Sequence, residues 1–235
     1  MMHSMESVQK AMEALRNAMN EYSALPYTEL RLHISQGNMK IGKVHNFSMA
    51  PGHTCANCAG CLPYCYDIKA VLQYPNVVKA RAENTVMMQK NREATFIAIA
   101  DYLEKHNMHK AFRWHVSGDI LDIDYFDRMC ALATAHPDWT FWTYTKNYKS
   151  VNDWIDANSG PDSYWRDSVP SNLVPMFSIW NGMPCPNPHR LPTFTCIQEG
   201  MTPAPGDWYC PGNCQVCLES GHGCPHGESS YVREH

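Results

Sequence analysis

The chain has no long apolar run, and its positive and negative charges nearly balance. No apolar stretch in the 235 residues approaches the roughly 20 residues that a membrane-spanning helix needs, so no membrane partner is expected. Nineteen basic residues against 23 acidic ones leave a formal net charge of −4, so charge does not indicate nucleic acid as a partner. The N-terminal stretch lacks the apolar core of a secretory signal peptide, which favours a cytoplasmic protein.

Several familiar catalytic motifs are also missing. The sequence has no Gly-rich phosphate loop, no Ser-His-Asp order of the hydrolase type and no HExxH zinc helix. These absences direct attention to the residue type that the chain has in unusual density, which is cysteine.

One short segment carries four cysteines with the spacing C-x2-C-x2-C-x3-C. They are Cys55, Cys58, Cys61 and Cys65. Bacterial ferredoxins use this spacing to hold iron–sulfur clusters. A structural zinc site normally takes two ligands from one knuckle and two from a distant one, whereas here one loop supplies all the thiols. The segment therefore predicts a 4Fe–4S cluster.

The C-terminal part of the chain holds a second concentration of cysteines. The eleven cysteines are odd in number and tightly clustered, unlike those of a secreted disulfide scaffold, which again favours a reducing compartment. We expect a second metal site here, either an auxiliary iron–sulfur cluster or a structural zinc. Its predicted ligands are Cys196, Cys210, Cys214 and Cys217, with Cys224, His222, His226 and His235 as substitutes.

Helical and strand patterns alternate through most of the chain. Apolar residues three or four apart predict helices over residues 5–22, 77–105 with a break near Asn91, 125–135 and 151–157. Strands are expected at residues 29–35, 112–116, 139–145 and 174–179. This alternation predicts an α/β fold with a mainly parallel sheet or a partial (β/α) barrel. Residues 1–183 would form this domain, and residues 184–235 an irregular, metal-binding Cys- and His-rich tail that caps it.

Ligands of such folds gather where loops leave the carboxyl ends of the strands. The cysteine segment and Ser117-Gly118-Asp119 both follow predicted strands, so they should lie on one rim. Asp119 is a candidate for cofactor recognition, with the alternative that it is a buried acid accepting hydrogen bonds from loop amides. Further candidates are Thr143 and Thr145, which share one strand face and suit ribose or carboxylate contacts, and Asn38 and Lys40, which either bind an anion or form a solvated turn.

Two family resemblances can be read from these motifs. The chain resembles the gene product 88 family of phage and mobile-element proteins in Gly37-Asn38-x-Lys40-x-Gly42-Lys43, Cys65-Tyr66, HVSGD (115–119), FWTYTK (141–146) and Cys214-x2-Cys217 with a late His235. The order of strand, cysteine loop, helix and second strand ending in a small-Gly-acid turn is similar to that of radical S-adenosylmethionine enzymes. The loop departs from their usual C-x3-C-x2-C, Ser117 stands where they have glycine, and their proline is absent.

The second resemblance implies a function. Cys55, Cys61 and Cys65 would hold a 4Fe–4S cluster with an open iron, and Asp119 would recognise the amino group of S-adenosylmethionine. The protein would then cleave this cofactor reductively to act on a substrate, with a flavodoxin or ferredoxin as electron donor, in the cytoplasm of a bacterial host and encoded by a phage. If Cys58 also ligates, the cluster is saturated and the protein is an electron carrier. A zinc-ordered phage regulatory or binding module is the remaining alternative.

Overall fold

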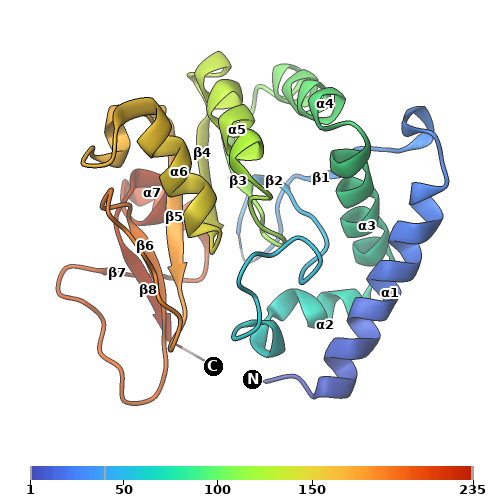
Figure 1. Ribbon diagram of the computed structural model, residues 1–235, viewed down its shortest axis with the longest axis horizontal. Coiled ribbons are helices and arrows are strands. Elements are labelled where there is room, and N and C mark those ends of the chain that lie inside the picture. Colours follow the sequence, from blue (N-terminus) through green and yellow to red (C-terminus); the bar gives the residue numbers. More distant parts are fainter. Residues whose placement is uncertain (1, 40, 234–235) are drawn as a thin grey trace.

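A computed structural model describes residues 2–39 and 41–233, so two predicted residues, Lys40 and His235, lie outside it. Over these ranges the fold is built on an eight-stranded sheet with the order β1-β2-β3-β4-β5-β6-β8-β7 (Figure 1). The strands are β1 (Ile34–Ser35), β2 (His45–Phe47), β3 (Ala111–Trp114), β4 (Thr140–Thr145), β5 (Leu173–Ile179), β6 (Thr193–Ile197), β7 (Trp208–Tyr209) and β8 (Ser230–Arg233). Only β1, paired with β2, runs antiparallel to its neighbour. The predicted α/β fold with a mainly parallel sheet is confirmed.

The described ranges contain the helices α1 (Met5–Ser23), α2 (Tyr66–Gln73), α3 (Pro75–Lys90), α4 (Arg92–Lys105), α5 (Ile123–Ala135), α6 (Tyr148–Ser159) and α7 (Cys214–Ser220). Helices α2 to α6 connect the successive strands β2 to β5. No helix in the described ranges is both long and apolar enough to cross a membrane. α1 packs along α3 and α2 at the β1 end of the molecule (Figure 1).

The helix starts are set by side-chain caps. The predicted break near Asn91 is real: Asn91 leaves the helical conformation, and its side chain accepts a hydrogen bond from the Ala94 amide at 3.0 Å. Asp122 accepts from the Tyr125 amide at 2.9 Å and thereby starts α5. Such caps satisfy backbone N–H groups that have no partner within the helix.

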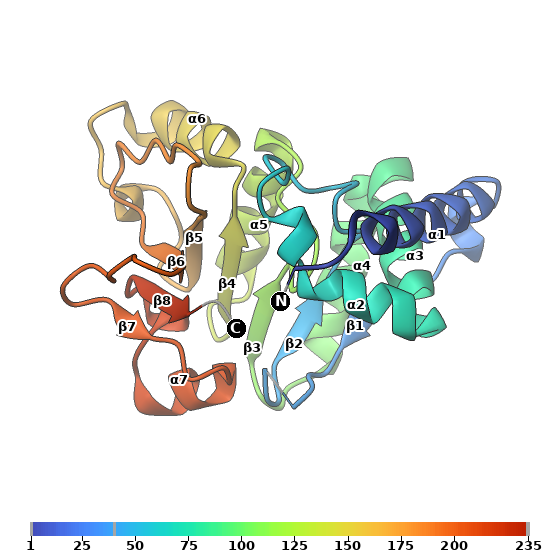
Figure 2. The same ribbon diagram turned by 90° about the horizontal axis from the view of Figure 1, so that it is seen from below.

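The two faces of the sheet are covered by different parts of the chain. On one face Phe96 of α4 packs against Trp114 of β3, with ring centroids 5.6 Å apart, and Tyr148 of α6 packs against Phe177 of β5 at 4.9 Å. The other face carries Arg113 and meets the C-terminal segment. Figure 2 shows α7 on the side of the sheet opposite α5 and α6.

Two parts of the sheet differ from the sequence-based expectation. The predicted strand at residues 29–35 is reduced to Ile34–Ser35, because side chains of α3 hold the backbone that precedes it. Glu83 accepts from the Arg31 amide at 2.8 Å, and Asn84 accepts from the His33 amide at 2.9 Å. The strand that leads into the cysteine segment is instead β2, which the sequence analysis did not identify.

The C-terminal segment is more regular than expected. β6 pairs with β5, and β8 and β7 extend the sheet further, while α7 and the short 3₁₀ turn Cys224–His226 lie between β7 and β8. The described part of the C-terminal segment, up to residue 233, therefore continues the sheet.

Candidate functional site

A cavity of about 440 Å³ opens where the chain leaves β2, β3 and β4. Its wall includes the four thiols of the cysteine loop, residues 48–65, and four thiols of the C-terminal segment, namely Cys210, Cys214, Cys217 and Cys224. Ser117, Gly118 and Asp119 line the same cavity. The expected meeting of the cysteine segment and the Ser-Gly-Asp turn on one rim is thus observed. The volume lies in the range of small-molecule sites.

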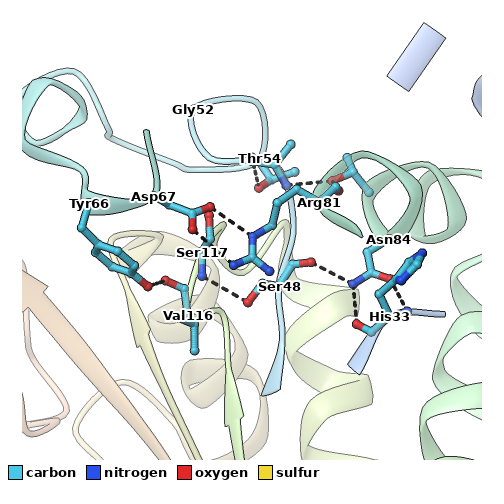
Figure 3. Close-up of polar contacts among 12 residues, drawn as sticks. His33, Ser48, Gly52, Thr54, Tyr66, Asp67, Arg81, Asn84, Val116 and Ser117 are labelled. Atoms are coloured by element: carbon cyan, nitrogen blue, oxygen red, sulfur yellow. Dashed lines mark hydrogen bonds and ion pairs between the residues drawn. The ribbon is translucent and has the colours of Figure 1, made fainter. Parts of the chain in front are cut away.

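Polar side chains of α3 fix the first part of the cysteine loop. Asn84, which is fully buried, donates to the Ser48 carbonyl at 2.9 Å (Figure 3). Thr85 accepts a hydrogen bond from the Ala50 amide at 2.9 Å and donates to the Arg81 carbonyl. The backbone leaving β2 is therefore attached to a helix before it reaches the first cysteine.

The later part of the loop and the start of α2, which follows it directly, are attached at three further points. Arg81 forms an ion pair with the buried carboxylate of Asp67 at 3.1 Å (Figure 3). The Tyr66 hydroxyl donates to the carbonyl of Val116, just after β3 (Figure 3). Asn57 donates to the Lys146 carbonyl, just after β4, at 2.8 Å. The loop is consequently held against the ends of two neighbouring strands.

The loop thiols influence one another electrostatically. Burial, followed by the nearby Asp119 carboxylate, raises the pKa of Cys55. Burial and the Cys61 thiol raise the pKa of Cys58, and burial raises that of Cys65 to about 11. With their pKa values raised, these groups are protonated, neutral thiols when no cation is bound. A bound metal ion favours the thiolate form and deprotonates them.

The Ser-Gly-Asp turn is packed tightly against the cysteine loop. Gly118 has φ +89°, and a Cβ atom there would lie 2.8 Å from the Thr54 hydroxyl oxygen and 3.0 Å from the Cβ of Met49. The Ser117 carbonyl accepts from the Met49 amide at 2.9 Å. Only glycine fits this position, because it alone tolerates both the backbone conformation and the close approach.

Asp119 is held by three hydrogen bonds. Its Oδ1 accepts from the Thr145 hydroxyl at 2.6 Å and the Ile120 amide at 2.7 Å, and its Oδ2 accepts from the Lys146 amide at 2.9 Å. Burial raises its pKa to about 6, although these hydrogen bonds act in the opposite direction. Asp119 thus accepts from loop amides, as one alternative had it, and it also lines the cavity.

The other predicted cofactor residues occupy different positions. Thr145 and Asn38 line the cavity. Thr143 lies in the core, bonded to the His115 ring at 3.1 Å, and is not part of the cavity wall. The Ser117 hydroxyl is buried and has no hydrogen-bond partner within the described part of the chain, so it remains able to bind a ligand.

The described residues of the Gly-Asn-x-Lys-x-Gly-Lys motif, 37–39 and 41–43, include a contact with α7. A Cβ atom on Gly37 would lie 1.9 Å from the Gly42 carbonyl oxygen, and one on Gly42 would lie 2.4 Å from the Cβ of Gln215. The Lys43 amide donates to the Gln215 side chain at 3.2 Å. Gly37 therefore allows the close approach of the Gly42 carbonyl, and Gly42 allows the contact with the C-terminal segment.

The second cysteine group differs from the predicted set in one member. Cys210, Cys214 and Cys217 line the cavity together with Cys224, which the sequence analysis gave only as a substitute. Cys196 lies on β6 opposite Val232 and is not part of the cavity wall. The side chains as placed bring no three His, Cys, Asp or Glu residues of the described ranges close enough to hold a metal ion.

Sequence reasoning missed one charged residue of this site. Arg113 projects from the middle of β3 into the cavity wall, and its Nη1 lies 3.6 Å from the Cys214 sulfur. Its guanidinium carbon lies 4.6 Å from the ring centroid of Tyr144. The available signal was a charged residue within an otherwise apolar and aromatic strand.

Comparison with known proteins agrees with the motifs. No curated protein and no solved structure shows a significant match to this chain. The gene product 88 family matches residues 15–182, which include the cysteine loop, the Ser-Gly-Asp turn and the strands β1 to β5. The chain therefore belongs to the gene product 88 family.

Proposed function

We propose that this protein is an iron–sulfur enzyme of the radical S-adenosylmethionine type. The observation that carries the proposal is the shared cavity: loop thiols that follow β2, a Ser-Gly-Asp turn that follows β3 and a Thr-Lys pair that ends β4 all line it. Adjacent parallel strands deliver these groups from their carboxyl ends, where ligand sites of α/β folds form. A 4Fe–4S cluster held by Cys55, Cys61 and Cys65 would supply the electron that cleaves S-adenosylmethionine.

The donor set fits this cluster chemically. Thiolates are the usual ligands of iron–sulfur clusters, and the loop places all four of its thiols on the cavity wall. The loop is also attached to α3 and to the ends of β3 and β4 by side-chain hydrogen bonds. Such attachment limits the movement of the backbone that carries the ligands, which favours metal retention.

Asp119 is suited to bind the amino group of the cofactor. Each carboxylate oxygen has two acceptor positions. Oδ1 uses both, for Thr145 and Ile120, whereas Oδ2 accepts one hydrogen bond from Lys146 and keeps the other position. Because its pKa is raised only to about 6, the group is mainly ionised at neutral pH and can pair with an ammonium.

Two further groups suit the polar parts of the same ligand. The buried Ser117 hydroxyl lines the cavity without a partner in the described ranges. The Lys146 ammonium donates to the Ser178 hydroxyl at 2.9 Å, and both residues line the cavity. A lysine ammonium at this position could pair with the carboxylate of S-adenosylmethionine.

The electron donor of the enzyme would be a flavodoxin or ferredoxin.

The position of Cys58 favours a second candidate, an electron-transfer protein. Cys58 lines the cavity with the other three loop thiols. If it provides a fourth ligand, the cluster has no open iron and transfers electrons without cleaving the cofactor. The two candidates therefore differ in whether S-adenosylmethionine reaches the metal.

The test is anaerobic purification of the full chain, with iron, sulfide and zinc quantified, followed by electron paramagnetic resonance of the reduced protein with and without S-adenosylmethionine. A signal that changes on addition of the cofactor, in wild type and in Cys58→Ala, supports the enzyme. An unchanged signal supports the electron carrier. Zinc without iron in the wild type contradicts both and leaves a zinc-ordered phage regulatory module.

Matched variants assign the loop. Cys55→Ala should remove the cluster, whereas Cys185→Ala should keep it, because Cys185 is partly buried but lies outside the cavity wall. Equal losses in both variants would contradict the assignment of the cluster to the loop.

A further inference from the structure

We propose that Cys210, Cys214, Cys217 and Cys224 form a second, four-thiolate metal centre, and that the partly buried guanidinium of Arg113 is its counter-charge. The ligand set belongs to the C-terminal segment, beyond the residues that the family match covers. The inference is independent of whether the loop cluster cleaves S-adenosylmethionine.

The backbone brings these four thiols to one side of the cavity. Cys214 and Cys217 lie on consecutive turns of the same face of α7, since they are three residues apart. Cys210 precedes this helix, and Cys224 begins the 3₁₀ turn that follows it. All four line the cavity, whereas Cys196 does not.

Gly223 allows the turn that carries Cys224 to approach α7. It has φ +77°, and a Cβ atom there would lie 3.1 Å from the Cys217 sulfur and 2.9 Å from the Trp208 ring. A turn at Gly223 therefore brings the chain that carries Cys224 back towards Cys217. This closure is the observation that favours Cys224 over Cys196.

Arg113 supplies the opposite charge. Its Nη1 contacts the Cys214 sulfur at 3.6 Å, and its Nε is buried with no hydrogen-bond partner among the described residues. No carboxylate of the described ranges forms an ion pair with it. A guanidinium stays charged inside a protein, and a partly buried charge without an ionic partner is unfavourable.

A thiolate centre resolves this imbalance. Four thiolates around a divalent metal ion, or around a 4Fe–4S cluster in its usual oxidised state, leave a net charge of about −2. Arg113 lies beside Cys214 and over Tyr144, so it neutralises part of that charge inside the cavity wall. The stacked ring also shields the cation from solvent.

The test uses the full chain with all four loop cysteines replaced by alanine, and circular dichroism to confirm folding. After anaerobic purification we expect this variant to retain metal, either iron with sulfide or zinc, and the metal found identifies the centre. If it is purified without metal, Co²⁺ is the probe, and sulfur-to-cobalt charge-transfer absorption is the expected signal. A folded variant that neither retains metal nor shows the Co²⁺ absorption would overturn the proposal. This result would not argue against the proposed loop cluster, because the variant lacks the loop cysteines.

Single substitutions in this background separate ligands from neighbours. Cys224→Ala should lower metal affinity strongly, and Cys196→Ala should leave it unchanged. The reverse result would overturn the ligand set.

The role of Arg113 as a counter-charge is tested by chelator competition. If Arg113 only stabilised the fold, its replacement would not change how tightly the folded protein holds metal. Arg113→Met should lose metal to a chelator at about 10- to 100-fold lower chelator concentration, as for other outer-shell partners. Arg113→Lys, which restores a positive charge, should recover most of this difference. A Met variant that is folded and holds metal as tightly as the wild type would overturn the role of Arg113.

Discussion

The hydroxyl of Thr145 donates a 2.6 Å hydrogen bond to the carboxylate of Asp119, although the two residues are 26 positions apart in the sequence. This bond joins the turn after β3 to the last residue of β4. The shape of the rim therefore depends on contacts between loops as well as on the sheet beneath them.

Replacement of Thr145 by valine should destabilise the protein by about 1–3 kcal/mol, because a buried carboxylate oxygen loses a donor. Chemical denaturation measures the change. Thr134→Val is the control: Thr134 bonds within its own helix, at a more exposed position, and its replacement should have a smaller effect. An equal effect of the two substitutions would contradict a special role for the Asp119 contact.

Two buried groups predict opposite pH dependences of stability. Burial lowers the pKa of His115 from 6.5 to about 3. The unfolded chain therefore binds a proton that the folded chain does not, and stability falls as pH decreases from 6.5 towards 3, by up to about 1.4 kcal/mol per pH unit. Asp119 has its pKa raised from 3.8 to about 6, so the folded state binds the proton first and stability rises as pH falls through 6 towards 3.8.

In the wild type these two contributions oppose each other between about pH 6 and pH 4. His115→Asn should make the protein gain stability over this window relative to wild type as the pH falls, and Asp119→Asn should make it lose stability more steeply. Thermal unfolding of the three proteins across this range measures both slopes. If stability depended on pH in the same way in all three proteins, the predicted pKa shifts of His115 and Asp119 would be contradicted.

The close approach at Gly118 gives a prediction with a well-matched control. Gly118→Ala and Gly160→Ala place a methyl group at nearly the same backbone angle, φ +89° and +93°, but Gly160 has no neighbouring atom within 4 Å. Gly160→Ala should show the backbone strain alone, about 1–3 kcal/mol, because φ +93° with ψ 166° is a conformation that essentially only glycine adopts. Gly118→Ala should be less stable than that, because Thr54 and Met49 must move, and it should alter the cavity.

Asn84 provides a test of the loop attachment. Its side chain bonds to the Ser48 carbonyl and to both backbone groups of His33, so Asn84→Ala leaves one buried and two partly buried backbone groups without a side-chain partner. We expect a loss of about 3 kcal/mol or more in the free energy of unfolding. The loop should also become sensitive to limited proteolysis. Asn158→Ala, where the amide only bonds to the carbonyl one turn back, is the control.

Local patterns predicted the elements that are long and regular. The apolar repeat of α1 and the cap at Asn91 depend on neighbouring residues, so both are visible in the sequence. β2 is three residues long and fully buried, which gives no alternation to detect. β8 is recognisable only through its parallel partners β6 and β7, which lie far away in the chain.

The same difference between local and long-range contacts decides which residues of the candidate site could be predicted. The thiols of the cysteine loop are close in sequence, and the cavity contains all of them. The placement of Cys224, and not Cys196, on the cavity wall depends on a glycine turn and on strand pairing, which residue spacing does not show. Arg113 became a site residue only because the C-terminal segment packs on its face of the sheet.

The position of β8 has a consequence for the order of assembly. β8 pairs with β6 and β7 and follows every residue of the cavity wall in the chain. During synthesis the cysteine loop emerges from the ribosome while the opposite wall is still untranslated, so its thiols pass through a period of exposure to water and oxidants. The cavity wall is thereby completed only after its last residue, Pro225, and the β8 strand that follows it have been translated.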